Sequence, residues 1–305
     1  MSDIDLNDLS RCYGRAFLSC DLVAPGANRT YRLATKGEAY YLRLYRAAGR
    51  SPAEIAFELR LLREVRPTPG IDVARPIRTA EGADCASIVF ESVTRAACLF
   101  QALGGRAVAC EIGDMALFGA ALAKLHDALA GIEGGEVRLL DLDPQTVCMR
   151  ATASLAAIPH SAAARHAIDH CRMEMLRGPA PHDLPSGNCH GDAWSANAII
   201  RDGSVGFIDF DDCGYGPYLL DLGTPVWHLV MREPSQSGAL VAALLAGYES
   251  ERALTKAERL ALPNFVKLAE VRSLTFLAEF CTLEDGLWSR VLDRAVNLLE
   301  RELII

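Results

Sequence analysis

Residues 189–217, CHGDAWSANAIIRDGSVGFIDFDDCGYGP, decide how this chain is expected to fold. Within them, two short apolar stretches, at 198–201 and 205–210, have the length of β-strands. They are separated by the dipeptide Asp202-Gly203, which favours a tight hairpin turn. The stretch therefore predicts a two-stranded ribbon in a region otherwise rich in helical patterns.

Three polar residues flank this ribbon. Asp192 and Asn197 precede its first strand, and Asp209 closes its second, so all three are expected at the same end. Hard oxygen ligands on a rigid hairpin suit Mg²⁺, which usually takes one or two protein carboxylates and leaves other positions to phosphate and water. With Asn197 and Asp209 assigned to a metal, Asp192 is free to face a hydroxyl group.

Composition limits the function classes. The chain has 305 residues, is 50% hydrophobic, and carries a formal net charge of -8 with a pI of about 5.4. Its length predicts two lobes or domains. The acidic balance argues against a general nucleic-acid binder and is common among soluble enzymes. The sequence starts without a basic, apolar leader, and its longest apolar run, 239–247, is far short of the ~20 residues of a membrane span, so a cytoplasmic protein is expected.

The ten cysteines are scattered, without a Cys-x-x-Cys pair. Cys189, His190 and Cys213 lie near one another in the sequence, but a fourth zinc ligand at usable spacing is missing. Reduced, mostly buried thiols are expected rather than disulfides or a metal centre.

The pattern along the chain predicts an α+β fold with a small β-rich lobe and a larger helical lobe. Strands are expected at 18–24, 29–34, 39–45, 73–78 and 86–91, with a helix opening at Ser51-Pro52. After residue 93 helical patterns dominate; they cover 111–130, 151–158, 162–177, 238–252, 256–280 and 286–303. In the helix after Ser51, Glu58 falls on the apolar stripe, where a carboxylate needs a partner.

The residues around Asp192 resemble a known family. His-x-Asp, followed by Asn and then by an Asp closing the next strand, is similar to the catalytic loop and metal-binding Asp of protein kinases. The detailed sequence is more similar to the aminoglycoside phosphotransferase/choline kinase-like (phosphotransferase enzyme) family. The matching positions are His190-Gly191-Asp192, Asn197, Ile208-Asp209-Phe210, Gly216-Pro217 and Asp221-Leu222.

The resemblance covers most of the chain and implies a protein kinase-like two-lobe fold. It implies a nucleotide-binding lobe at 1–92 and a lobe with the catalytic loop and substrate site at 93–305. YYLRLYR resembles the third strand of the small lobe, AEIAFELRLLREV the helix that carries an ion-pairing Glu, and IVFESV the last strand and hinge. LAKLHDAL resembles a helix before the catalytic loop, in which His126 is expected to be packed and hydrogen-bonded.

For the large lobe, the resemblance implies that Asp192 is the catalytic base. It implies that Asn197 and Asp209 hold Mg²⁺ on the phosphates of ATP. His190 would brace the catalytic loop, and Asp221 would anchor it from the following helix.

For the small lobe, the resemblance implies that Glu58 pairs with a cation on the third strand. The family usually has Lys there; the matching residue here is Arg43, which keeps the charge with a different geometry. Asn28, in a turn without the full glycine motif, and the expected hinge residues Glu91 and Val93 complete the predicted nucleotide contacts.

The acceptor of the phosphate is left open. IDFDDCGYGP and VFESV resemble the bacterial YihE-like stress-response Ser/Thr kinase branch, whereas HGDAWSANA is similar to fructosamine kinases, in which Pro follows the metal Asp instead of Phe210. Aminoglycoside- or choline-type acceptors would use acidic or aromatic residues, with Asp212, Trp194, Tyr215 and Glu279 as candidates. Acidic residues outnumber basic ones over 267–290, which slightly favours a cationic or polyhydroxyl acceptor.

A non-enzymatic alternative is a pseudokinase-like nucleotide-binding or scaffold module. Only Arg43 supports it, and the complete set of Asp192, Asn197 and Asp209 argues against it.

Overall fold

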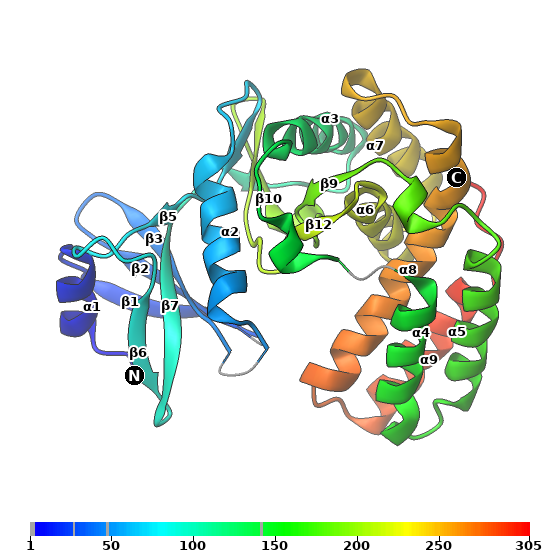
Figure 1. The fold of residues 1–305 in the computed structure, drawn as a ribbon, viewed down its shortest axis with the longest axis horizontal. Helices are drawn as coiled ribbons and strands as arrows, with labels where there is room; N and C mark the ends of the chain where they lie inside the picture. Colours follow the sequence, from blue (N-terminus) through cyan, green and yellow to red (C-terminus); the bar gives the residue numbers. More distant parts are fainter. Residues whose placement is uncertain (1–3, 27, 47–48, 141–142) are drawn as a thin grey trace.

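The chain folds into a β-rich lobe and a helical lobe that lie side by side (Figure 1). The computed structural model describes residues 4–26, 28–46, 49–140 and 143–305. The arrangement is the kinase-like α+β fold predicted from the sequence. In the described ranges, no helix has both the length and the apolar character to span a membrane.

The small lobe is built on a six-stranded antiparallel sheet of order β1-β2-β3-β7-β5, with β6 paired to the first half of β7. Two helices accompany the sheet. The elements are α1 (Leu6–Tyr13), β1 (Ser19–Pro25), β2 (Arg29–Ala34), β3 (Ala39–Leu44), α2 (Pro52–Glu64), β5 (Pro76–Ile77), β6 (Ala86–Phe90) and β7 (Val93–Gln101).

Alternation along β3 sets the two faces of this sheet. Leu42 and Leu44 are fully buried in the apolar core of the lobe. Arg43 points to the opposite face, toward α2, as the sequence predicted. α2 starts where expected, because Ser51 and Glu54 form a reciprocal capping box and Pro52 occupies the first turn.

The lobe boundary differs from the predicted one. Residue 92 was expected to end the small lobe, but Glu91 and Ser92 have φ of 48° and 64° and form the turn between β6 and β7. β7 then contributes its apolar residues to the same sheet, so the connection to the large lobe follows Gln101. The polar pair Glu91-Ser92 interrupts the apolar pattern at a hairpin turn rather than at a hinge.

The large lobe contains seven α-helices among its described residues. They are α3 (Ile112–Leu129), α4 (Pro144–Ser154), α5 (Ala162–Met175), α6 (Leu219–Arg232), α7 (Ser237–Glu251), α8 (Lys256–Phe280) and α9 (Asp285–Leu299). The helical patterns in the sequence predicted six of these approximately, although α4 lies several residues earlier than its prediction. They missed α6, because Gly223 and Pro225 lie inside it.

Two small sheets carry the functional segments of this lobe. One has the order β4-β11-β10-β8, and the other pairs β12 with β9. Their strands are β4 (Ile71–Val73), β8 (Arg106–Ala107), β9 (Ser186–Cys189), β10 (Ala198–Arg201), β11 (Ser204–Phe207) and β12 (Gly214–Pro217). β4 comes from the N-terminal part of the chain and runs parallel to β11.

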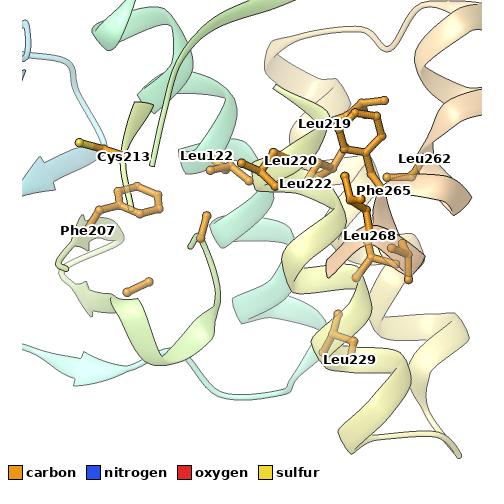
Figure 2. Close-up of a cluster of buried hydrophobic side chains, with 14 of the residues drawn as sticks. Leu122, Phe207, Cys213, Leu219, Leu220, Leu222, Leu229, Leu262, Phe265 and Leu268 are labelled. Atoms are coloured by element: carbon orange, nitrogen blue, oxygen red, sulfur yellow. The ribbon is translucent and has the colours of Figure 1, made fainter. Parts of the chain in front are cut away.

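α6 lies in the centre of the large lobe. Figure 2 shows its apolar side chains, including Leu220 and Leu222, between Leu122 of α3 and Phe265 of α8. Phe207, the last residue of β11, belongs to the same buried cluster. The hairpin predicted from the sequence is thereby fixed to the helical core.

The ten cysteines are free thiols. Five are buried, four are partly buried, and Cys12 is exposed. Burial raises the pKa of the Cys148 and Cys171 thiols to about 12, which keeps them protonated and unreactive.

Candidate active site

The β10–β11 hairpin brings the predicted site residues to one end. Asp202 and Gly203 have φ of 50° and 76°, the signature of the tight turn expected for this dipeptide. At the opposite end, the amide of Ile208 donates to the carbonyl of Asn197 over 3.0 Å. The segment before β10 and the segment after β11 are therefore held together, as the sequence predicted.

Asn197 is tied directly to Asp192. Its Nδ2 donates to the backbone carbonyl of Asp192 and to its Oδ2, both over 2.9 Å. These bonds fix the orientation of the buried amide, so that its Oδ1 remains as an acceptor for another group. These two bonds use neither the Asn197 Oδ1 nor the second carboxylate oxygen of Asp192.

The carboxyl group of Asp192 has a perturbed pKa. Burial, followed by the charge of Asp212, raises it to about 6, and Asp209 adds to the effect. The charges of His190 and Arg272 act in the opposite direction. A carboxylate with a pKa near 6 is ionised at neutral pH and is a stronger base than an ordinary aspartate.

Asp221 holds the catalytic loop in place. Its two carboxylate oxygens accept from the backbone amides of His190 and Gly191 over 2.6 and 2.8 Å. Burial alone would raise the pKa of Asp221, but hydrogen bonds from His126 and the loop, with the charge of His190, hold it below its usual value. Asp221 contacts the loop from α6, as the resemblance implied.

Two histidines brace this arrangement. The Nε2 of His126 lies 3.2 Å from Asp221, and its Nδ1 lies 2.9 Å from the Tyr248 hydroxyl, so His126 is the packed helix residue expected. The Nε2 of His190 lies 2.8 Å from the carbonyl of Ile208. His190 thereby links the segment before β10 to the segment after β11.

Arg43 joins the lobes at the site. Its Nη1 lies 2.5 Å from Glu58 on α2, and its Nη2 lies 2.7 Å from Asp209. The Tyr45 hydroxyl donates to the second oxygen of Glu58 over 2.9 Å. Burial alone would lower the pKa of Arg43, but Asp209 and Glu58 raise it well above its ordinary value. The buried Glu58 therefore has the cationic partner that the sequence predicted.

The donor set fits a magnesium ion. Asp209 has φ of 63°, a conformation uncommon for a residue with a side chain, and about half of its side chain is exposed. The Oδ1 of Asn197 supplies a second hard oxygen. In the described part of the chain, no three His, Cys, Asp or Glu side chains form a metal-binding group. One carboxylate and one amide match the sparse protein ligation that Mg²⁺ accepts beside phosphate.

Two of the predicted nucleotide contacts, Glu91 and Val93, have other positions, whereas Asn28 lies in the expected turn. Glu91 and Val93 belong to the β6–β7 hairpin rather than to a hinge, and Glu91 lies 3.5 Å from Arg29. Glu91 lies in the turn after β6 and Val93 is the first residue of β7, so the sheet of the small lobe continues beyond both. Asn28 accepts a hydrogen bond from the amide of Arg46 over 3.0 Å, which braces the β1–β2 turn.

The connection between the lobes consists of residues 102–105. Gly105 has φ of 138°, and a Cβ there would lie 2.4 Å from the carbonyl of Ile200 on β10. Only glycine allows this close approach. The sequence analysis did not identify this segment, although its Gly-Gly pair after an apolar strand was a usable signal.

Two of the four acceptor candidates lie beside the catalytic loop. The Trp194 ring centroid is 4.4 Å from that of His228 on α6. Asp212 affects the pKa of Asp192 and forms an ion pair with Arg50. These two positions form part of the surroundings of Asp192.

The other two candidates have different neighbours. Tyr215 pairs with Asn188 across the β12–β9 sheet, and its hydroxyl acts on the pKa of Tyr218. Glu279 is bound by Arg150 over 2.6 Å and by the Ser154 hydroxyl over 2.8 Å. The sequence near Tyr215 and Glu279 does not indicate these partners, because the partners come from distant parts of the chain.

Two arginines missed by the sequence analysis brace the segment after Asp209. Arg138 donates to the carbonyls of Asp211 and Cys213 over 2.7 and 3.0 Å, and its guanidinium also lies 4.0 Å from Glu58. Arg50 donates to the carbonyl of Asp211 over 2.7 Å. The positive charges of Arg43, Arg50 and Arg138 outweigh the effect of burial and lower the pKa of Asp211.

The comparisons with known proteins agree with this geometry. A model of the phosphotransferase enzyme family matches residues 23–259. A homoserine kinase of Gluconacetobacter diazotrophicus is 30% identical over 284 residues, which span 90% of this chain and 82% of that protein.

Two solved structures have the same fold. An amicoumacin kinase in complex with AMP-PNP and Ca²⁺ has a TM-score of 0.78 and 20% identity, covering 97% of this chain and 92% of its own. A microcompartment-associated aminopropanol kinase also has a TM-score of 0.78, with 22% identity and coverage of 96% and 94%.

Proposed function

Because this chain belongs to the phosphotransferase enzyme family, we propose that it transfers the γ-phosphate of ATP, with Mg²⁺, to a hydroxyl group of a small molecule. The proposal rests on one observation: Asp192, Asn197 and Asp209 lie at the same end of the hairpin. Asn197 donates a hydrogen bond to Asp192, and Arg43 donates one to Asp209.

Arg43 would bind the phosphates of ATP from the small lobe. Glu58 and Tyr45 hold its guanidinium, so little side-chain entropy is lost when the phosphates bind. Arginine keeps its charge at every physiological pH, so it would bind the phosphates where the family usually has lysine. The nucleotide-binding lobe would extend to Gln101, where β7 ends.

Asn197 and Asp209 would hold the metal through the Asn197 Oδ1 and the Asp209 carboxylate. When bound there, Mg²⁺ neutralises phosphate charge and orients the γ-phosphate. To bind it, Asp209 must give up part of its contact with Arg43.

Asp192 would accept the proton of the acceptor hydroxyl. Its Oδ2 is held by Asn197, and its pKa of about 6 suits a base that works near neutral pH. The loop that carries it is fixed by Asp221 through two backbone amides, so the carboxylate is positioned before the substrate arrives.

The names of the relatives support a small acceptor. One is a homoserine kinase, and two proteins of the same fold are named for amicoumacin and aminopropanol. Homoserine and aminopropanol each carry a hydroxyl and an amino group. We propose an amino alcohol or hydroxy amino acid as the acceptor, phosphorylated in the cytoplasm.

Phosphate transfer from labelled ATP tests the proposal. The acceptor panel contains L-homoserine, 3-aminopropan-1-ol, choline, an aminoglycoside and a basic Ser/Thr protein. We expect Mg²⁺-dependent transfer to a small molecule. Transfer to the protein alone would instead favour the stress-response kinase branch, and ATP binding without any transfer would favour the scaffold.

Two variants locate the chemistry. Asp192→Asn should lower transfer by ~10²–10⁴-fold while ATP still binds. Asp209→Ala should abolish Mg²⁺-dependent ATP binding. Asp202→Asn is the matched control, because Asp202 lies exposed at the opposite end of the same hairpin and Asn accepts its positive φ. Native activity in Asp192→Asn would exclude it as the base.

A further inference from the structure

An arginine of α8 lies beside the catalytic loop without a role in the site described so far. Both terminal nitrogens of Arg272 lie 3.3 Å from the carbonyl oxygen of Gly191, the residue before Asp192. Its charge also lowers the pKa of Asp192. Arg272 is therefore within electrostatic reach of the proposed catalytic base, on the side of the large lobe.

The guanidinium of Arg272 has unused hydrogen-bonding capacity. It carries five N–H donors, and charge-assisted bonds to oxygen are normally 2.7–2.9 Å long. Its two contacts are longer than this and share one neutral oxygen. Within the described ranges, no carboxylate lies within ion-pair distance of it, and the side chain is partly exposed.

Nearby cations on the same helix or opposite it are already paired. The ammonium of Lys267 lies 2.9 Å from Glu174. Arg150 of α4 is bidentate to Glu279. Among the described residues, Arg272 thus differs from these neighbours in having no partner of opposite charge.

Glu270 and Glu279 of α8 are bound by other residues of the protein, so neither is free to bind a cationic acceptor. Glu270 is fully buried and accepts a hydrogen bond from the Trp227 indole over 2.5 Å. Glu279 is neutralised by Arg150. Counting charges over 267–290 did not reveal Arg272 beside the loop, because the count ignores that Glu270 and Glu279 are bound by other residues.

Trp194 and His228, which lie against each other beside the loop, are both neutral. Burial and the charge of Arg232 lower the pKa of His228 to about 4, so its imidazole is uncharged at neutral pH. Its Nε2 is buried without a hydrogen-bond partner in the structure, and the Trp194 ring lies against it. A small acceptor here would meet the positive charge of Arg272, an indole and a neutral imidazole, in addition to the carboxylates of Asp192 and Asp212.

We propose that Arg272 binds a carboxylate of the acceptor, so that the enzyme selects hydroxy acids or hydroxy amino acids over alcohols that lack this group. The inference rests on the proposed phosphotransferase function. A planar guanidinium can hold a carboxylate through two parallel hydrogen bonds, which would orient the acceptor hydroxyl toward Asp192.

Pairs of acceptors that differ only by the carboxylate test this role. L-homoserine is paired with 3-aminopropan-1-ol, and L-serine with 2-aminoethanol. In the native protein, the carboxylate should raise kcat/KM by about 10- to 100-fold, the usual contribution of a charged hydrogen bond. Arg272→Gln should remove most of this preference, because kcat/KM should fall far more for the acceptor with the carboxylate than for its partner, mainly through KM.

Controls separate this role from a structural one. Arg290→Gln, at an exposed position of α9, should keep the native preference. Arg272→Lys keeps the charge and should recover part of it. If Arg272→Gln slows both members of a pair equally, Arg272 supports the loop or the transferred phosphate, and the proposal is overturned.

Calorimetry provides a readout that needs no transfer. The hydroxy acids should bind the native protein and bind Arg272→Gln about tenfold more weakly or worse. Binding of a hydroxy acid without phosphate transfer would contradict the proposed function and leave the carboxylate site standing. Transfer to carboxylate-free acceptors without any binding of a hydroxy acid would support the proposed function and overturn the carboxylate site.

Discussion

Arg43 and Asp209 are joined by an ion pair of 2.7 Å, although Arg43 belongs to the sheet of the small lobe and Asp209 follows the hairpin of the large lobe. The same guanidinium also holds Glu58 of α2 over 2.5 Å. A planar fork can engage two carboxylates at once, whereas a lysine ammonium acts as a single point charge. Arginine at this position thus links the strand, the helix and the residue that follows the hairpin.

Removal of this cation should affect both stability and nucleotide binding. Arg43→Met leaves Glu58 buried with only the Tyr45 hydroxyl as a direct hydrogen-bond partner, so we expect a loss of about 3 kcal/mol in the free energy of unfolding. The KM for ATP should rise at least tenfold. Arg32→Met, on the exposed face of neighbouring β2, is the control for thermal denaturation and kinetics. An unchanged KM for ATP would remove Arg43 from the nucleotide site.

Activity should depend on pH through Asp192. A base must be ionised, so kcat/KM for the acceptor should fall about tenfold per pH unit below pH ~6 and level off above it. Asp212→Asn removes a charge that raises this pKa, and the midpoint should therefore move to lower pH. A midpoint that stays in place would show that another group controls the acid limb.

The same shift predicts an effect of opposite sign on stability. The pKa of Asp192 is higher in the folded protein than its usual value. Ionisation of this carboxylate therefore lowers the free energy of unfolding as the pH rises from about 4 to about 6, and the loss is constant above that range. Asp192→Asn should accordingly raise the melting temperature at pH 8 relative to the native protein, and less so at pH 4. Equal differences at both pH values would contradict this account.

Asp221 should be essential for the loop. In Asp221→Asn an amide nitrogen would face the backbone N–H of His190 or Gly191, so a donor would meet a donor. We expect a loss of about 2–4 kcal/mol in the free energy of unfolding, and loss of kcat in the folded fraction. Asp293→Asn, exposed on α9, is the control in the same denaturation experiment.

The pairing of α3 with α7 depends on two glycines. A Cβ on Gly247 would lie 1.9 Å from the carbonyl of Ala116, and one on Gly119 would lie 2.0 Å from that of Leu244. Both obstacles are backbone, so Gly247→Ala should destabilise the protein by about 3 kcal/mol or more. Gly113→Ala, in the first turn of α3 with open space around it, should be neutral or slightly stabilising in chemical denaturation.

The site was predictable where its residues are close in the sequence. Asp192, Asn197 and Asp209 lie within one hairpin, and the turn Asp202-Gly203 fixes their common end without help from distant segments. The Arg43–Glu58 pair was also accessible, because strand alternation and helix periodicity each turned one charge toward the interior.

The errors concern relations that need the whole fold. Glu91-Ser92 resembles a hinge until β7 is seen pairing with β3, and α6 is hidden by its own Gly and Pro. Arg272 reaches the catalytic loop from a helix 80 residues downstream, and no local pattern distinguishes it from a surface arginine. The proposed choice of acceptor rests on this last kind of relation.

The parallel pairing of β4 with β11 has a consequence for the independence of the two lobes. Ile71–Val73 form a strand in the sheet that carries the catalytic hairpin, although they are encoded between α2 and β5 of the small lobe. A gene fragment that begins after residue 105 would lack this strand and leave the edge of β11 open to other chains. The two halves are therefore not interchangeable modules, and recombination between relatives would need a crossover before residue 71 to preserve the sheet.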